Sequence, residues 1–205
     1  MRAGVAQGTT LARLRELVLA EGGELAGAIA ADPGPEALAP LVAASERCAD
    51  RADDYGLMIE SILEGYLVHY GRPRLIEPPD ENLRLLVGDY LYALGLARLA
   101  ALGDLPAVRQ LADVIALSAE AHAALEAPPP ELPEAIWAVG ALSVAGGPWP
   151  RGEEAKQSLR EGLAGAPAAA LEAALRRAAA LGIEQEARRA LIAFNRQRLR
   201  QADST

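Results

Sequence analysis

The sequence predicts an all-α protein, and both its composition and the spacing of its apolar residues lead to this prediction. Alanine, the best helix former, supplies 45 of the 205 residues. The β-branched residues that favour strands are few, with 9 Val, 8 Ile and 3 Thr. Apolar residues recur every three to four positions between clusters of Gly and Pro. We therefore expect one domain over 1–205, an antiparallel bundle of eight or so helices with almost no β structure and a frayed end at 202–205.

Turn residues divide the first half of the chain into separate helices. Thr9 or Thr10 is suited to cap the first helix, and the glycines at 22–23 are suited to break it. Further turns are marked by Gly and Pro at 32–35 and 71–73. Helices are expected over 10–31, 36–54, 55–70 and 81–102.

The second half contains the most apolar segment of the chain. Residues 135–150 carry no charge, yet this stretch is too short to span a membrane. We expect a helix over Glu134–Ala145 to be buried on all sides near the centre of the bundle. Asp104 is suited to cap the helix before it, with Pro106 in the first turn. The expected ranges are 104–127, 134–145 and 153–201, the last divided into two or three helices near 165–167 and 182.

Two glycines indicate a close contact between helices. Gly88 and Gly95 lie seven residues apart on one face of the helix expected over 81–102. Each glycine inside a helix costs about 1 kcal/mol relative to alanine. Their presence therefore predicts that another helix packs closely there, either from the same chain or from a second copy.

The charge and the cysteine content limit the classes of function. A formal charge of −8 makes the protein as a whole repel nucleic acid and anionic lipid, so broad electrostatic binding to either is excluded. The single cysteine, Cys48, cannot form an internal disulfide, and the first ten residues lack the apolar core of a leader. We expect a cytoplasmic protein. Only one of the 20 basic residues is Lys, which indicates GC-rich coding and a bacterial source.

Residues with recognisable chemistry are few. Cys48 has no base in a known local pattern, so we expect it to be structural. His69 and His122 fit no zinc or di-iron spacing, which leaves no predicted resident metal or other cofactor. Asp53 and Asp54 are expected to lie at the positive end of the next helix, where acids are favoured.

Glu60 and Glu64 are the remaining candidates. They are four residues apart, so they share one face of the helix expected over 55–70. Two interpretations stay open at this point. The pair is either a solvated strip on the outside of the bundle or part of a functional site.

The sequence around this pair resembles the trans-polyprenyl diphosphate synthase family. The segments Val87–Ala93 and Leu99–Asp104 are similar to a helix of that family that typically reads leucine-alanine-glycine-aspartate-tyrosine-leucine. In the family this helix follows an aspartate-rich DDxxD motif and a loop with arginine-arginine-glycine-x-proline. The similarity extends over about 57–117 and implies an isoprenoid-synthase-like, all-α fold. Counting back without a gap places the loop's glycine and proline on Gly71 and Pro73, and the three aspartates on Glu60, Ser61 and Glu64.

The chain departs from the family pattern at the positions that carry its chemistry. Family members hold Mg²⁺ ions between aspartates of two facing helices, and the ions bind the allylic diphosphate. Here the first cluster reads Glu-Ser-x-x-Glu, and the second DDxxD is missing after Asp113. His69 and Tyr70 replace the two arginines that would grip diphosphate. Glu60 and Glu64 are therefore expected to hold Mg²⁺ weakly through water at most, and no catalytic residue is predicted.

This pattern predicts a non-catalytic, synthase-like protein. We expect it to be the small or regulatory partner subunit of a two-component polyprenyl diphosphate synthase, with the catalytic subunit as its partner. One alternative is a stand-alone helical binding or interaction protein, a homodimer that takes an apolar isoprenoid ligand or none. The other is a minimal active prenyl transferase. The expected ligand cavity would be lined by His69, Tyr70, Arg72, Asp89 and Tyr90.

Overall fold

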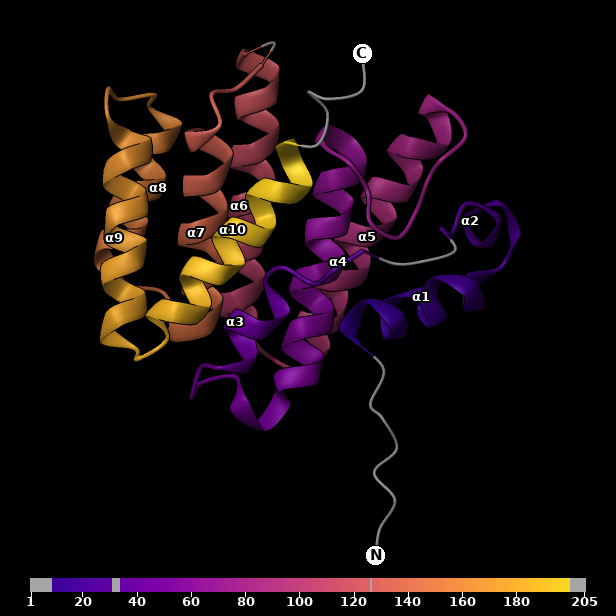
Figure 1. Ribbon diagram of the computed structural model, residues 1–205, viewed down its shortest axis with the longest axis horizontal. Helices are drawn as coiled ribbons and strands as arrows, with labels where there is room; N and C mark the ends of the chain where they lie inside the picture. Colours follow the sequence, from indigo (N-terminus) through magenta and orange to yellow (C-terminus); the bar gives the residue numbers. More distant parts are fainter. Residues whose placement is uncertain (1–8, 31–33, 126, 200–205) are drawn as a thin grey trace, which may run out of the picture.

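The computed structural model describes residues 9–30, 34–125 and 127–199. These residues form ten α-helices and one short 3-10 helix, which pack together as a single bundle (Figure 1). They contain no strand, only an isolated antiparallel bridge between Ile29 and Ile76. The predicted all-α class is confirmed, with ten helices in place of eight or so. The frayed end expected at 202–205 lies outside the described residues.

The helices are α1 (Thr10–Glu21), α2 (Gly23–Gly27), α3 (Ala39–Ala43), the 3-10 helix η1 (Ala49–Arg51), α4 (Ala52–Tyr70), α5 (Glu81–Ala101), α6 (Leu105–Ala124), α7 (Glu131–Gly146), α8 (Pro150–Arg160), α9 (Ala166–Ala180) and α10 (Glu184–Leu199).

Side-chain caps fix the starts of three helices. Side-chain oxygen atoms of Thr9, Asp80 and Asp104 each accept a hydrogen bond from the backbone N–H three residues later in the chain. The distances are 3.2, 2.8 and 3.1 Å. Such a bond satisfies one of the donors that a helix start leaves unpaired. The predicted caps at Thr9 and Asp104 are thereby confirmed. The break after α1 falls at Gly22, whose φ of 73° is the left-handed conformation that glycine adopts without strain.

The prediction of a helix over 36–54 is wrong. The structure has there the five-residue α3, a series of turns and η1 before α4 begins at Ala52. The N–H groups of Ala37, Leu38 and Ala39 donate to the carboxylate of Glu60 on α4. These three N–H groups have their hydrogen-bond acceptor in a distant side chain. They therefore do not need the carbonyl oxygens of a preceding helical turn. In this segment the hydrogen bonds to Glu60 stand in place of the hydrogen bonds of a continuous helix.

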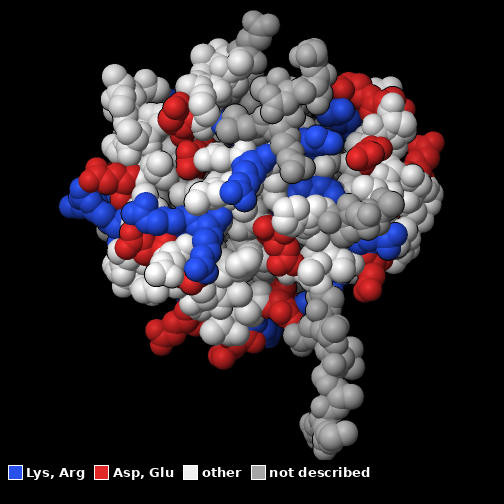
Figure 2. Space-filling model, viewed as in Figure 1, with Lys and Arg blue, Asp and Glu red and all other residues white. Residues whose placement is uncertain are grey.

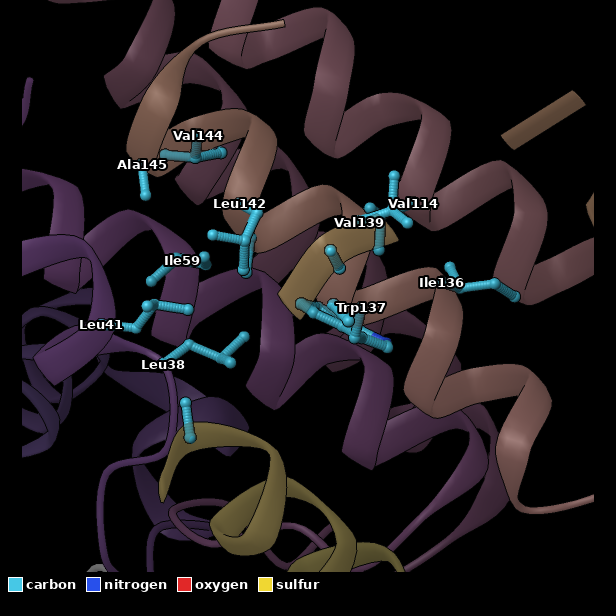
Figure 3. Close-up of a cluster of buried hydrophobic side chains, with 14 of the residues drawn as sticks. Leu38, Leu41, Ile59, Val114, Ile136, Trp137, Val139, Leu142, Val144 and Ala145 are labelled. Atoms are coloured by element: carbon cyan, nitrogen blue, oxygen red, sulfur yellow. The ribbon is translucent and has the colours of Figure 1, made fainter. Parts of the chain in front are cut away.

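Helix α7 is buried near the centre of the bundle, as its lack of charge predicts. Every residue from Ala135 to Ala145 is buried. Leu38 just before α3, Leu41 of α3 and Ile59 of α4 face α7 on one side (Figure 3). Val114 of α6 lies on another side. Gly140 makes this approach possible, because a Cβ at that position would clash with Val114. The helix spans Glu131–Gly146, a turn longer than expected at its start.

The close contact predicted by Gly88 and Gly95 lies within the chain, between α5 and α4. A Cβ on Gly95 would stand 2.5 Å from Cγ1 of Ile62 and 2.9 Å from the carbonyl oxygen of Met58. A Cβ on Gly88 would clash with the ring of His69. The two helices run side by side in Figure 1 and share the most extensive helix contact among the described residues.

Helix α4 separates two apolar clusters. One side of it packs with α3, α6, α7, α9 and α10 in the main core, and the other packs with α1, α5 and the segment at 75–76. Its residues from Gly56 to Val68 are all buried. Any polar side chain in this buried stretch must therefore find its partners inside the protein. None of the described helices is both long enough and apolar enough to cross a membrane.

Candidate functional site

Glu60 and Glu64 lie in the middle of α4, and the side chains of both are 0% exposed. The interpretation of the pair as a solvated strip is therefore wrong. Transfer of an isolated carboxylate into a protein interior is costly unless the charge is paired and hydrogen-bonded. One signal of this burial is present in the sequence, because the residues around the pair, from 55 to 68, are almost all apolar.

The charge that balances them is Arg74, which sequence reasoning did not single out. Its Nε donates to Oε2 of Glu64 at 2.9 Å, and its Nη1 donates to Oε2 of Glu60 at 2.5 Å. Its Nη2 reaches the carbonyl oxygen of Glu60 at 3.3 Å, and Nη1 reaches that of Pro35 at 3.5 Å. Burial opposes the charged guanidinium, but the two carboxylates outweigh it and raise the pKa of Arg74. We call Glu60, Arg74 and Glu64 the buried triad.

Backbone groups complete the coordination of the two carboxylates. Oε1 of Glu60 accepts from the N–H groups of Ala37, Leu38 and Ala39 at 2.8, 2.6 and 2.8 Å. Oε1 of Glu64 accepts from the N–H groups of residues 74 and 75, both at 2.7 Å. Two carboxylates and one guanidinium leave the triad with one net negative charge. Hydrogen bonds from five backbone N–H groups stabilise this charge. Through these hydrogen bonds, the triad holds the start of α3 and the segment after α4 against the centre of α4.

The middle position of the aligned motif, Ser61, is also structural. Its hydroxyl donates to the carbonyl oxygen of Leu91 at 2.9 Å and so joins α4 to α5. Each carboxylate oxygen of the aligned pair already accepts at least one donor, and the guanidinium stands between the two side chains. Among the described residues, no group of three or more His, Cys, Asp or Glu side chains could hold a metal ion.

The five residues predicted to line a ligand cavity, His69, Tyr70, Arg72, Asp89 and Tyr90, lie in three separate surroundings. Nε2 of His69 lies 3.3 Å from Oδ1 of Asp89, and its ring stacks on Tyr92 rather than facing an opening. Tyr90 points to α1, where its hydroxyl donates to Oε1 of Glu21 at 3.1 Å. Arg72 lines a hollow beside α10, away from the other four residues. Residues close in sequence point to different faces here, because helix rotation and tilt separate them.

His69, Tyr70 and His122 belong instead to a ladder of rings at the end of α4. Tyr70 stacks on His122 with 4.1 Å between centroids and 6° between planes. The hydroxyl of Tyr66 lies 3.4 Å from Nε2 of His122, and Trp137 and Phe194 continue the ladder into the core. Burial raises the pKa of Tyr66 to about 12. Burial, aided by the charge of Arg198, lowers the pKa of His122, so this imidazole is held neutral.

Three other residues singled out from the sequence, Cys48, Asp53 and Asp54, are placed as their chemistry suggests. Cys48 is fully buried, with Sγ 3.7 Å from the carbonyl oxygen of Val144, and burial raises the pKa of its thiol. A buried thiol with a raised pKa is a poor nucleophile, which agrees with the structural interpretation. Asp53 and Asp54 lie in the first turn of α4, as predicted. They border an open hollow of about 900 Å³ between α1, α3 and η1.

A second hollow lies beside α10. Its volume is about 410 Å³, and it is bounded by the segment at 34–35, the segment at 72–77 and the end of α10. Arg72 and Arg196 stand at its rim, and Arg74 of the buried triad forms part of its floor.

Comparison with known proteins identifies no relative: no family model, no curated protein and no solved structure matches this chain. Fold and site together define a single-domain helical bundle in which a buried ion-pair triad joins two irregular segments to α4.

Proposed function

We propose that this protein is a non-catalytic, synthase-like helical bundle that acts as the partner subunit of a catalytic polyprenyl diphosphate synthase. The observation that carries the proposal is the burial of Glu60 and Glu64 against Arg74. A site that ionises an allylic diphosphate needs carboxylates open to metal ions and to substrate. In this chain the carboxylates aligned with those positions are engaged with a guanidinium and five amides.

The triad gives those carboxylates a structural role in place of a chemical one. It holds α3 and the segment after α4 in fixed positions, so it shapes the bundle without contact to substrate. A rigid bundle of this kind contributes by packing against the catalytic subunit and by shaping the channel that sets product length. This role is compatible with the missing second aspartate motif and with the replacement of two arginines by His69 and Tyr70.

Co-purification with a motif-intact synthase from the same source tests the proposal. We expect the two chains to elute together and the distribution of product lengths to change when this chain is added. The isolated chain should give no product with Mg²⁺ and allylic and homoallylic diphosphates. Steady turnover by the isolated chain would contradict the proposal, and so would two chains that neither bind nor alter each other's products.

A stand-alone binding protein is the second candidate, and one observation favours it. The hollow beside α10 brings two exposed arginines and a buried glutamine together in a protein whose net charge is negative. A homodimer in size-exclusion chromatography, with no binding to any synthase, would favour this candidate over the first.

A further inference from the structure

The hollow beside α10 is built from three segments that lie far apart in the sequence. Pro35 comes from the loop before α3, Arg72 from the segment after α4, and Arg196 from the end of α10. The two segments that face α10 are tied to each other, since the N–H of Gly34 donates to the carbonyl oxygen of Arg74 at 3.0 Å. The side chain of Arg74 is locked in the buried triad. This side of the hollow is therefore held in place before any ligand arrives.

The rim of the hollow presents positive charge. Arg72 and Arg196 are both exposed, and neither forms an ion pair with an acid of the described part of the chain. Helix α10 lies across the face shown in Figure 1, and basic side chains are visible over this face in Figure 2. Guanidinium groups offer several N–H donors in a planar array that matches carboxylate and phosphate oxygens. One end of a ligand in this hollow is thus expected to be an anion.

Acceptor groups line the same hollow. Gln197 is 7% exposed, and its Nε2 donates to the carbonyl oxygen of Pro35 at 2.8 Å, which fixes the amide. Its Oε1 is buried and accepts no hydrogen bond from the described residues. That oxygen is enclosed by the protein, so a ligand in the hollow does not reach it. The carboxylate of Glu77 is a second acceptor, and it is exposed.

We propose that this hollow binds a small organic acid that also carries a hydrogen-bond donor, such as an ammonium or hydroxyl group. The acid, a phosphate or a carboxylate, pairs with Arg72 and Arg196. The donor meets the exposed carboxylate of Glu77, while Pro35 and Ala193 supply apolar contact. An anion without a donor meets the charge of Glu77 with nothing to offset it, so it binds more weakly.

This inference goes beyond the subunit role, and its test needs no partner. The purified full-length chain is titrated by calorimetry and by NMR with four probes: phosphate, phosphoethanolamine, acetate and β-alanine. In each acid class the second probe adds an ammonium group to the first. We expect the probes with a donor to bind more tightly than their simple counterparts, by about tenfold for one added charge-assisted hydrogen bond. The better of the two acid classes identifies the acid.

Variants at exposed positions separate ligand binding from folding. Arg72→Gln and Arg196→Gln should each weaken binding of phosphoethanolamine and of phosphate by about tenfold. Glu77→Gln should weaken phosphoethanolamine and leave phosphate unchanged or tighter. Arg189→Gln is the matched control, because Arg189 is exposed on α10 and does not line the hollow.

Three results would overturn the inference. The first is the absence of saturable binding of any probe at millimolar concentration. The second is binding that responds to Arg189→Gln as strongly as to Arg196→Gln, which would indicate general attraction to a basic surface. The third is equal affinity for the probes with and without the donor. None of these results depends on whether a synthase binds this chain, so the subunit proposal stands or falls separately.

Discussion

Two clusters in this protein bury a cation among carboxylates, and they differ in how much of each cluster reaches water. In the buried triad, the side chains of Arg74, Glu60 and Glu64 are 3%, 0% and 0% exposed. In the second cluster, Lys156 is also 3% exposed, but its partners Asp113 and Glu153 are 29% and 44% exposed. The same kind of charge pairing is therefore fully enclosed between α4 and its neighbouring segments and open on one side between α6 and α8.

The backbone distinguishes the two clusters further. The triad carboxylates accept hydrogen bonds from five backbone N–H groups of two irregular segments. Lys156 instead bonds to side chains, at 2.5 Å to Asp113 and 2.9 Å to Gln110. The triad determines the path of the chain around α4, whereas the lysine cluster joins two helices that form from local sequence. Loss of the triad should therefore affect the whole bundle.

The largest effect is expected from removal of the triad's cation. Arg74→Met leaves two buried carboxylates without their counter-charge, and breaking a buried ion pair in this way costs about 3–5 kcal/mol. Urea unfolding monitored by circular dichroism should show this loss or an unfolded variant. Arg72→Met at the exposed neighbour is the control and should change the unfolding free energy by less than about 0.5 kcal/mol. Equal effects of the two substitutions would contradict the assignment of the triad.

A smaller effect is expected when one carboxylate is replaced by its amide. Glu60→Gln keeps an acceptor for the amides of α3 but removes the charge that faces Arg74, and we expect a loss of about 2 kcal/mol. Amide hydrogen exchange offers a local measurement. The N–H groups of Ala37, Leu38 and Ala39 should exchange faster in the variant, while those of α9 should not. Unchanged protection at 37–39 would show that the carboxylate does not fasten this segment.

Lys156→Met should cost less than half of the loss seen for Arg74→Met, about 1 kcal/mol. The reason is that Asp113 and Glu153 reach solvent and are rehydrated when the ammonium group is lost, as for exposed ion pairs. The comparison uses the same urea titration for both variants. If the lysine variant lost as much stability as the arginine variant, exposure of the partners would not explain the difference between the clusters.

A third, partly buried cluster around Asp104 offers a test by pH. Burial opposes the charge of Asp104, but hydrogen bonds from Tyr55 and Arg47 outweigh it and lower the pKa of the carboxyl. A lowered folded-state pKa gives stability that is present above the unfolded value of 3.8 and is lost as the pH falls through the folded value. The difference in unfolding free energy between wild type and Asp104→Asn should shrink below about pH 4. A difference that is constant from pH 7 to pH 2 would contradict this.

The smallest effect is expected from salt. Between 0.05 and 1 M NaCl the screening length falls from more than 10 Å to about 3 Å, which weakens charge interactions that solvent reaches. The stability difference between wild type and Lys156→Met should therefore shrink by a few tenths of a kcal/mol. The difference between wild type and Arg74→Met should change less, because ions do not enter the triad. Parallel urea titrations at the two salt concentrations measure both differences.

Much of the fold was determined by the sequence itself, because it depends on local physics. High alanine content and a small number of strand formers determine the all-α class. Asp104 marks a helix start through a bond to an amide three residues away, and uncharged residues at 135–145 require a buried helix wherever it packs. Gly88 and Gly95 indicated a close neighbour, although only the structure identified it as α4.

The candidate site was decided by tertiary structure. Glu60 and Glu64 look the same in sequence whether they face water or the core, and only the packing of α3 and of the segment at 74–75 around α4 encloses them. Arg74 lies ten residues beyond Glu64, across a turn, so no helical spacing connects them. The hollow beside α10 joins Pro35 to Gln197, which are 162 residues apart. Spacing rules reach one or two helical turns, whereas burial, counter-charges and cavities depend on which distant segments meet.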